Sequence, residues 1–158
     1  MKTVLLALSS AAREGGAPAA AVGRAKALEA GLLVAYVVDS RTIDGLERRV
    51  SGQGFVGERP CAELMSEAVQ EWRRCAQASL AEVVKAADEA GVRCEWQLVE
   101  GDWVELIASL IERSETEGVA IAECIAPDFA GSPLRKLLRT DDLARLKARV
   151  SCPVVSAP

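Results

Sequence analysis

Two short apolar stretches decide the fold class: Gly118 to Ala122, which reads Gly-Val-Ala-Ile-Ala, and Cys152 to Ala157, which reads Cys-Pro-Val-Val-Ser-Ala. The first is typical of a fully buried strand in a parallel sheet, and the second is a β-branched terminal strand closed by Pro158. In a parallel α/β sheet a ligand sits beyond the carboxyl end of a strand. Here that segment, Glu123 to Arg139, lacks the glycines that a phosphate needs. We therefore expect a nucleotide-type scaffold without the nucleotide chemistry.

Outward from this stretch, strands and helices alternate along the chain. Apolar runs predict strands at Thr3 to Leu8, Leu32 to Val38 and Val92 to Val99. The order predicts an α/β fold, an open five-stranded parallel sheet with helices on both faces. No linker, repeat or low-complexity tract interrupts it, so we expect one domain over residues 1–158.

The helices are predicted from caps and apolar spacing. Pro18 suits a first turn and Gly31 a C-cap, and the glycine-rich stretch 39–60 is expected to be a long loop. Asp102 is a good N-cap, Ser132-Pro133 indicates a short helix, and Thr140-Asp141-Asp142 starts a helix that runs to Arg149. The longest helix, about Cys61 to Ala90, carries an apolar stripe at spacings of three and four: Met65, Val69, Trp72, Ala76, Leu80, Val83 and Ala87. Trp72 and Trp96 are expected in the core.

Composition excludes several classes of function. The net charge of −4 argues against nucleic acid or an anionic membrane as the main partner. No run approaches the ~20 apolar residues of a membrane span, and the apolar run after Met1 is short for a signal peptide. The five cysteines are widely spaced and odd in number, which favours reduced thiols in the cytoplasm. The chain has no histidine, which removes Ser-His-Asp and Cys-His catalysis.

Several short motifs together resemble the universal stress protein family over nearly the whole chain. They are the first strand Val4 to Leu8, Ala90-Gly91-Val92 followed by Val99-Glu100-Gly101-Asp102, the strand at Gly118, and the closing Cys152-Pro153-Val154-Val155. The resemblance implies the adenine-nucleotide α-hydrolase type of sheet. It also implies a homodimer in which terminal strands meet edge to edge, through Val154, Val155 and Ser156. An unpaired edge strand favours such pairing, although Pro153 and Pro158 could instead blunt that edge.

ATP-binding members of this family carry an aspartate after the first strand, and Gly-x-x-Gly, nine residues, then Gly-Ser/Thr after the fourth. Here Ser9 stands at the aspartate position. Alignment from Cys152-Pro153 places Pro127, Ala130, Thr140 and Asp141 at the motif positions, and alignment from the fourth strand places Glu123 and Ala126 there. Proline has no N–H to offer a phosphate, and carboxylates repel one. The chain therefore resembles the branch that does not bind ATP, and no cofactor is expected.

A divergent crevice is the remaining candidate site, formed by Ser9, Asp39, Glu123, Cys124, Asp128, Thr140 and Asp141. Ser9 and Ser10 are expected to cap or turn rather than act as nucleophiles. Cys124 is the thiol to test first, although a structural role is favoured over a reactive one. Asp128, Asp141 and Asp142 could hold Mg²⁺, with helix capping as the favoured alternative. The basic residues Arg135, Lys136 and Arg139 could bind an anion or an acidic partner, or form a solvated helix face.

These features predict a non-enzymatic, cytoplasmic homodimer in stress response, or an accessory to another protein. Two alternatives stay open. One is a regulatory module that binds a small ligand or a nucleotide in the divergent crevice. The other is a nucleotide hydrolase, or a thiol-dependent enzyme of the same superfold, for which fold analogy is the only support.

Overall fold

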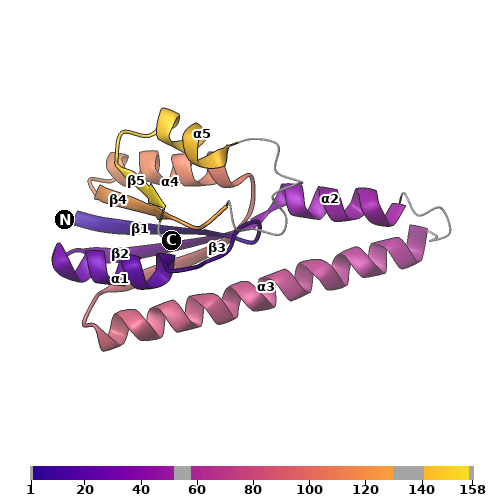
Figure 1. Ribbon diagram of the computed structural model, residues 1–158, viewed down its shortest axis with the longest axis horizontal. Helices are drawn as coiled ribbons and strands as arrows, with labels where there is room; N and C mark the ends of the chain where they lie inside the picture. Colours follow the sequence, from indigo (N-terminus) through magenta and orange to yellow (C-terminus); the bar gives the residue numbers. More distant parts are fainter. Residues whose placement is uncertain (1, 52–57, 130–140, 157–158) are drawn as a thin grey trace.

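The computed structural model describes residues 2–51, 58–129 and 141–156, and its centre is one parallel five-stranded sheet (Figure 1). The strands lie in the order β3-β2-β1-β4-β5, and every pairing is parallel. Their bounds are Lys2–Ser9 (β1), Gly31–Asp39 (β2), Cys94–Gly101 (β3), Ala120–Ala126 (β4) and Val154–Ser156 (β5). The predicted fold class is confirmed.

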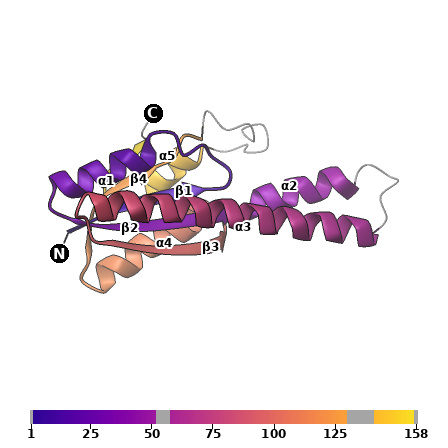
Figure 2. The same ribbon diagram turned by 90° about the horizontal axis from the view of Figure 1, so that it is seen from below.

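Helices cover both faces of this sheet (Figure 2). On one face α1 and α3 pack over a cluster that includes Leu6, Tyr36 and Leu80. On the other face α4 and α5 pack over a cluster that includes Trp103, Ile107 and Leu146. The helices are Ala17–Ala27 (α1), Ser40–Ser51 (α2), Glu58–Glu89 (α3), Trp103–Thr116 (α4) and Asp142–Arg149 (α5). The central strands β1 and β2 are buried on both sides, as continuous apolar runs predict.

The stretch 39–60 is not the predicted loop. Helix α2 begins immediately after β2, and α3 already begins at Glu58. Its 32 residues make α3 about 48 Å long, so its first half projects beyond the sheet beside α2 as a helical arm (Figure 1). Helical periodicity at Ile43, Leu46 and Val50 was a signal for α2, but the glycines at 45, 52, 54 and 57 obscured it.

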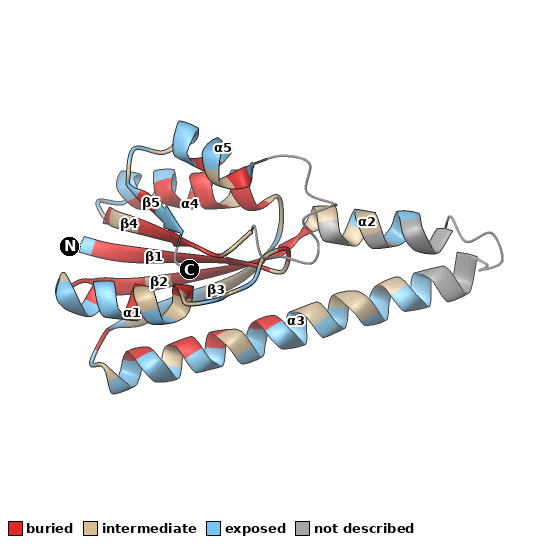
Figure 3. Cartoon of the chain, viewed as in Figure 1, coloured by how far each residue is buried: buried red, intermediate tan, exposed pale blue. Residues whose placement is uncertain are grey.

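The long apolar stripe of α3 therefore has two different environments. Ala76, Leu80 and Val83 are at most 2% exposed because they lie over the sheet. Met65 and Trp72, in the projecting half, are only partly buried (Figure 3). A single periodic pattern thus spans a core helix and an arm.

Local details also differ from the sequence expectations. Helix α1 ends at Ala27, and its C′ position is taken by Glu29 at φ +52°. The Glu29 and Ala30 N–H groups bond to the carbonyls of Lys26 and Ala25, which is the Schellman pattern. Gly31 is therefore the first residue of β2 and not a C-cap.

Two other expectations concerned β3 and α4. Trp96 as a whole residue is 55% exposed, since β3 is an edge strand, so Trp96 is not a core residue. Asp102 is confirmed as the N-cap of α4, where its Oδ1 accepts the Glu105 N–H at 3.0 Å. Within the described residues no helix is long and apolar enough to cross a membrane. The predicted Ser132-Pro133 helix lies outside the described residues.

Candidate functional site: the crevice at the carboxyl ends of the strands

The candidate site follows from the strand order. From β1 the chain moves to β2 on one side, and β4 lies on the other side, so the order reverses between β1 and β4. Ligands in open α/β sheets bind at this point, beyond the carboxyl ends of the strands. The loops after β1 and β4 and the first turns of α2 and α5 surround it (Figure 1).

The two serines after β1 accept hydrogen bonds from backbone N–H groups. Ser9 is 1% exposed, and its Oγ accepts the Ala11 N–H at 3.0 Å. The Oγ of Ser10 accepts the Asp39 N–H at 2.8 Å, and this bond links the end of β1 to the end of β2. The predicted turn role of these hydroxyls is confirmed.

Asp39 ends β2 and at the same time caps α2. Its carboxylate Oδ1 accepts the backbone N–H of Arg41 at 2.9 Å, which satisfies a free donor in the first turn of the helix. The Arg41 side chain returns to the same carboxylate, with Nε 3.0 Å from Oδ1 and Nη2 2.6 Å from Oδ2. The Asp39 side chain is fully buried, so this ion pair provides its charge compensation.

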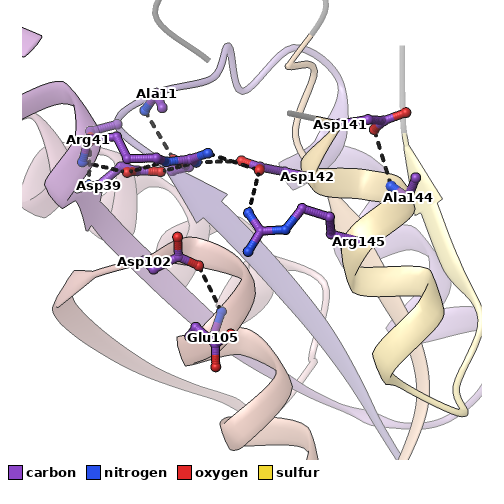
Figure 4. A network of polar contacts seen from close by, with 11 residues as sticks. Ala11, Asp39, Arg41, Asp102, Glu105, Asp141, Asp142, Ala144 and Arg145 are labelled. Atoms are coloured by element: carbon purple, nitrogen blue, oxygen red, sulfur yellow. Dashed lines mark hydrogen bonds and ion pairs between the residues drawn. The ribbon is translucent and has the colours of Figure 1, made fainter. Parts of the chain in front are cut away.

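The Arg41 guanidinium also reaches across to α5. Its Nη1 lies 2.9 Å from Oδ1 of Asp142, and its Nη2 lies 2.5 Å from Oδ2, a two-bond fork (Figure 4). The Asp142 side chain is 1% exposed. Hydrogen bonding to Asp39 and to Asp142 raises the pKa of Arg41, and burial opposes this only in part. We call these three side chains, Asp39, Arg41 and Asp142, the Arg41 clamp.

The amino end of α5 therefore presents carboxylates where a helix would attract a phosphate. Asp141 is its N-cap and accepts the Ala144 N–H at 3.1 Å, which confirms the predicted capping role. Asp142 follows in the first turn, held by Arg41 and more loosely by Arg145 at 3.4 Å. Both carboxylates compensate the positive helix end, which leaves little attraction for an external anion.

A pair of backbone hydrogen bonds also joins the loop after β1 to the loop after β4. The Arg13 N–H donates to the Asp128 carbonyl at 3.1 Å, and the Asp128 N–H donates to the Arg13 carbonyl at 2.9 Å. Strand β4 ends at Ala126, so Pro127 opens the loop in which the resemblance led us to expect the motif glycines. This strand end favours the register that aligns Pro127 with the first motif glycine. In that loop the Asp128 amide is already used, and Pro127 has no amide to give.

Only part of the predicted crevice comes together. Ser9, Asp39, Asp128 and Asp141 all lie at the carboxyl edge. Thr140 lies outside the described residues, as do Arg135, Lys136 and Arg139. Glu123 and Cys124 are not in the crevice, because β4 ends four residues later than predicted, at Ala126. Both residues lie inside the strand, paired with Val4 and Leu5 of β1.

The two misplaced residues have structural partners instead. The Glu123 carboxylate binds Arg24 of α1 through two bonds of 2.9 and 2.8 Å. Cys124 is fully buried in the cluster under α4, and burial raises the pKa of its thiol. A buried thiol held in its protonated form is a poor nucleophile, which agrees with the favoured structural role.

Sequence reasoning missed Arg41, the residue at the centre of the site. It lies in the stretch that was expected to be a loop, where a lone arginine carries no signal. The pattern Asp39-Ser40-Arg41 before an apolar helical period could have identified a capped helix start. Within the described ranges, no three Cys, Asp or Glu side chains form a group that could hold a metal ion.

Comparison with known proteins places the fold. No protein-family model and no curated protein matches the chain. Among solved structures, universal stress protein UspA from Lactobacillus plantarum is 15% identical with a TM-score of 0.62, over 99% of this chain and 97% of that one. A universal stress protein family member from Burkholderia pseudomallei is 21% identical with a TM-score of 0.59, over 99% and 94%. A universal stress protein in complex with cAMP is 16% identical with a TM-score of 0.53, over 99% and 95%. The resemblance is thus confirmed at the level of the fold.

Proposed function

We propose that this protein is a non-enzymatic protein of the universal stress protein type that does not bind ATP in the crevice beyond β1 and β4. The Arg41 clamp carries this proposal, because the Arg41 guanidinium at the crevice is already bound to two buried carboxylates. An incoming triphosphate would have to displace Asp142 from Arg41, and that buried carboxylate would then lose its two-bond partner. The Arg13–Asp128 backbone pair supports the same conclusion, since it uses the amide of the second residue of the loop.

The proposed activity is association with other proteins in the cytoplasm during a stress response, or as an accessory subunit. The absence of histidine and the burial of Cys124 support a role without catalysis. We further propose a homodimer through the β5 edge, where Val155 is 44% exposed beside Val154 and Ser156. The Cys124 N–H donates to the Pro153 carbonyl, so by alternation the Ser156 N–H faces away from β4. Sedimentation velocity of the wild type and of Ser156→Pro, which removes that N–H, tests the dimer. Ser156→Ala, which keeps the N–H, is the matched control.

Isothermal titration with Mg-ATP tests the nucleotide proposal. We expect no saturable heat up to about 1 mM ATP, since affinity weaker than that corresponds to less than about 4 kcal/mol of binding free energy. Tight ATP binding that disappears in Asp128→Pro would overturn the proposal and place the nucleotide on the loop after β4.

A second candidate is a regulatory module that binds a cyclic nucleotide, because one of the structurally similar proteins was solved with cAMP. A parallel titration with cAMP distinguishes the two. Saturable cAMP binding together with an absence of ATP binding would favour the regulatory module. If neither ligand binds, the non-nucleotide function is retained.

A further inference from the structure

We propose that the outer edge of β3 is a docking surface for an extended, uncharged apolar segment of a partner protein, which adds to the sheet as a sixth strand. Among the described residues no strand pairs with β3 on this side, and at eight residues it is a much longer edge than the three-residue β5. Its burial pattern is mixed, unlike the continuous burial of β1. Natural proteins normally protect such an edge.

The backbone of β3 presents a regular set of donors and acceptors to this partner. The Leu32 N–H donates to the Arg93 carbonyl at 2.8 Å, so the polar backbone groups of Arg93 face β2. Alternation along the strand then directs the N–H and C=O groups of Cys94, Trp96 and Leu98 away from the sheet. An added strand would satisfy these groups, which is the main-chain part of recognition by strand addition.

An aromatic side chain stands beside this free edge on the α3 face of the sheet. Cys94 and Leu98 pack against the cluster under α3, so Trp96, which lies between them, faces the same side. Trp96 as a whole residue is 55% exposed, and it is one of three large apolar residues that are exposed in the described part of the chain. Tryptophan at an exposed position is a typical anchor for a partner.

The opposite face of the same strand has a hollow of about 370 Å³ between β3 and α4. A second hollow of about 180 Å³ adjoins it and shares Gln97, Leu110 and Arg113 with the first. Leu33, Val99 and Leu106 contribute apolar surface to these hollows, and the lining of the larger one also includes the charged residues Arg93, Glu95, Arg113 and Glu117. Because successive residues of a strand point to opposite faces, an added strand would place one side chain on Trp96 and the next into the hollow.

Charge indicates the chemistry of the segment. The charged residues at the two ends of β3 pair internally, Arg93 with Glu95 at 3.2 Å and Glu100 with Arg73 of α3 at 2.5 Å. The centre of the edge, Trp96 to Val99, is uncharged. A second copy of β3 fits this centre less well. Antiparallel two-fold pairing centred on Trp96 places the Glu95 carboxylate opposite the second copy's Gln97, and pairing centred on Gln97 places it opposite the second copy's Val99. An uncharged apolar strand brings no carboxylate to that position.

A synthetic heptapeptide of alternating valine and threonine tests this surface. It is acetylated, amidated and N-methylated at every second nitrogen, so that one edge alone can form hydrogen bonds and the peptide cannot aggregate. The control peptide is methylated at every nitrogen. In amide NMR of the full chain, we expect the first peptide to bind with a Kd below about 1 mM. Hydrogen exchange should slow at Cys94, Trp96 and Leu98, and the control peptide should cause neither effect.

Three variants locate the binding. Trp96→Pro removes one outward N–H and the indole, and we expect it to abolish binding. Trp96→Gln keeps the N–H, and we expect about a tenfold loss, so this variant serves if the proline variant does not fold. Ser156→Pro removes an outward N–H at the other edge of the sheet, and this variant is expected to bind as the wild type does. Protection confined to β5, or no binding at 1 mM, would overturn the proposal. So would a wild-type dimer that Trp96→Gln converts to a monomer, because it would assign β3 to self-association.

Discussion

The Arg41 guanidinium forms a two-bond fork with the carboxylate of Asp142, which lies 101 residues later in the chain. This contact joins the first turn of α2 to the first turn of α5 across the carboxyl ends of the strands (Figure 4). Arg41 holds Asp39 with the same group, so one cation compensates two buried carboxylates. The crevice that could receive an anion therefore contains an internal ion triad.

Removal of the cation tests the energetic importance of this triad. We expect Arg41→Ala to lower the free energy of unfolding by about 3 kcal/mol, because two buried carboxylates lose the cation that binds both of them. Urea denaturation measures the change. The matched control is Arg145→Ala, since Arg145 is 41% exposed and reaches Asp142 only at 3.4 Å. The unfolding free energy of that variant should lie within about 0.5 kcal/mol of the wild-type value. Equal losses of unfolding free energy in the two variants would contradict the role of Arg41.

Stability at alkaline pH should depend on Tyr36. Burial under α1 and α3, with smaller contributions from Glu14 and Cys75, raises the pKa of Tyr36 to about 12. Between its ordinary value of 10.0 and about 12, the unfolded chain releases the phenolic proton while the folded chain keeps it. Raising the pH through this range therefore favours unfolding, by up to about 3 kcal/mol. Urea titrations at several pH values should show that Tyr36→Phe loses less unfolding free energy than the wild type between pH 10 and 12. Identical slopes of unfolding free energy against pH in the two proteins would refute the raised pKa of Tyr36.

The two halves of α3 should respond differently to truncation. Leu80 is 2% exposed against the sheet, and Leu64 in the arm is 48% exposed. We expect Leu80→Ala to cost about 2–5 kcal/mol of unfolding free energy because it opens a cavity in the core. Leu64→Ala should change the unfolding free energy by less than about 0.5 kcal/mol. Thermal and urea unfolding of both variants provide the comparison, and a large cost at Leu64 would show that the arm is part of the core.

Trp103 allows the cost of an unpaired donor to be measured. Its side chain is fully buried in edge-to-face contact with Phe129, with ring centroids 4.8 Å apart, and among the described residues its Nε1 has no hydrogen-bond partner. Trp103→Ala should lower the free energy of unfolding by about 3–5 kcal/mol, because it leaves a cavity in the core. Trp103→Phe also removes the unpaired N–H, which offsets part of the lost packing, so we expect less than about 1 kcal/mol. Similar losses in both variants would indicate that the indole N–H is satisfied.

Thiol reactivity should follow burial. Cys75 is exposed on α3, whereas Cys124 is fully buried and its pKa is raised by burial. An aromatic disulfide reagent should therefore modify Cys75 in the folded protein and reach Cys124 only after unfolding. Cys75→Ser should remove a fast phase of the reaction, and Cys124→Ala should leave the fast phases unchanged. Fast labelling that disappears in Cys124→Ala would instead identify a reactive thiol.

The sequence predicted the alternation of strands and helices correctly because each buried strand is a continuous apolar run, as at Val4 to Leu8. Caps such as Asp102 and Asp141 were also recognisable, since an N-cap is a contact within four residues. Predictions failed where the deciding contact was distant. The end of β4 was placed four residues early because the apolar run stops at Ala122 and the next residue, Glu123, is charged. In the fold the charge of Glu123 is compensated by Arg24 of α1.

The sequence by itself determined the fold class, the N-caps Asp102 and Asp141 and the absence of the Gly-x-x-Gly pattern after the fourth strand, because these depend on local periodicity and on residue types. The tertiary structure decided the state of the candidate site. Arg41, Asp39 and Asp142 come from three separate elements, and their charges compensate one another only when the ends of β2, α2 and α5 meet. Coulomb interactions depend on distance in space and not on separation along the chain, so no pattern in the sequence could assign this ion triad.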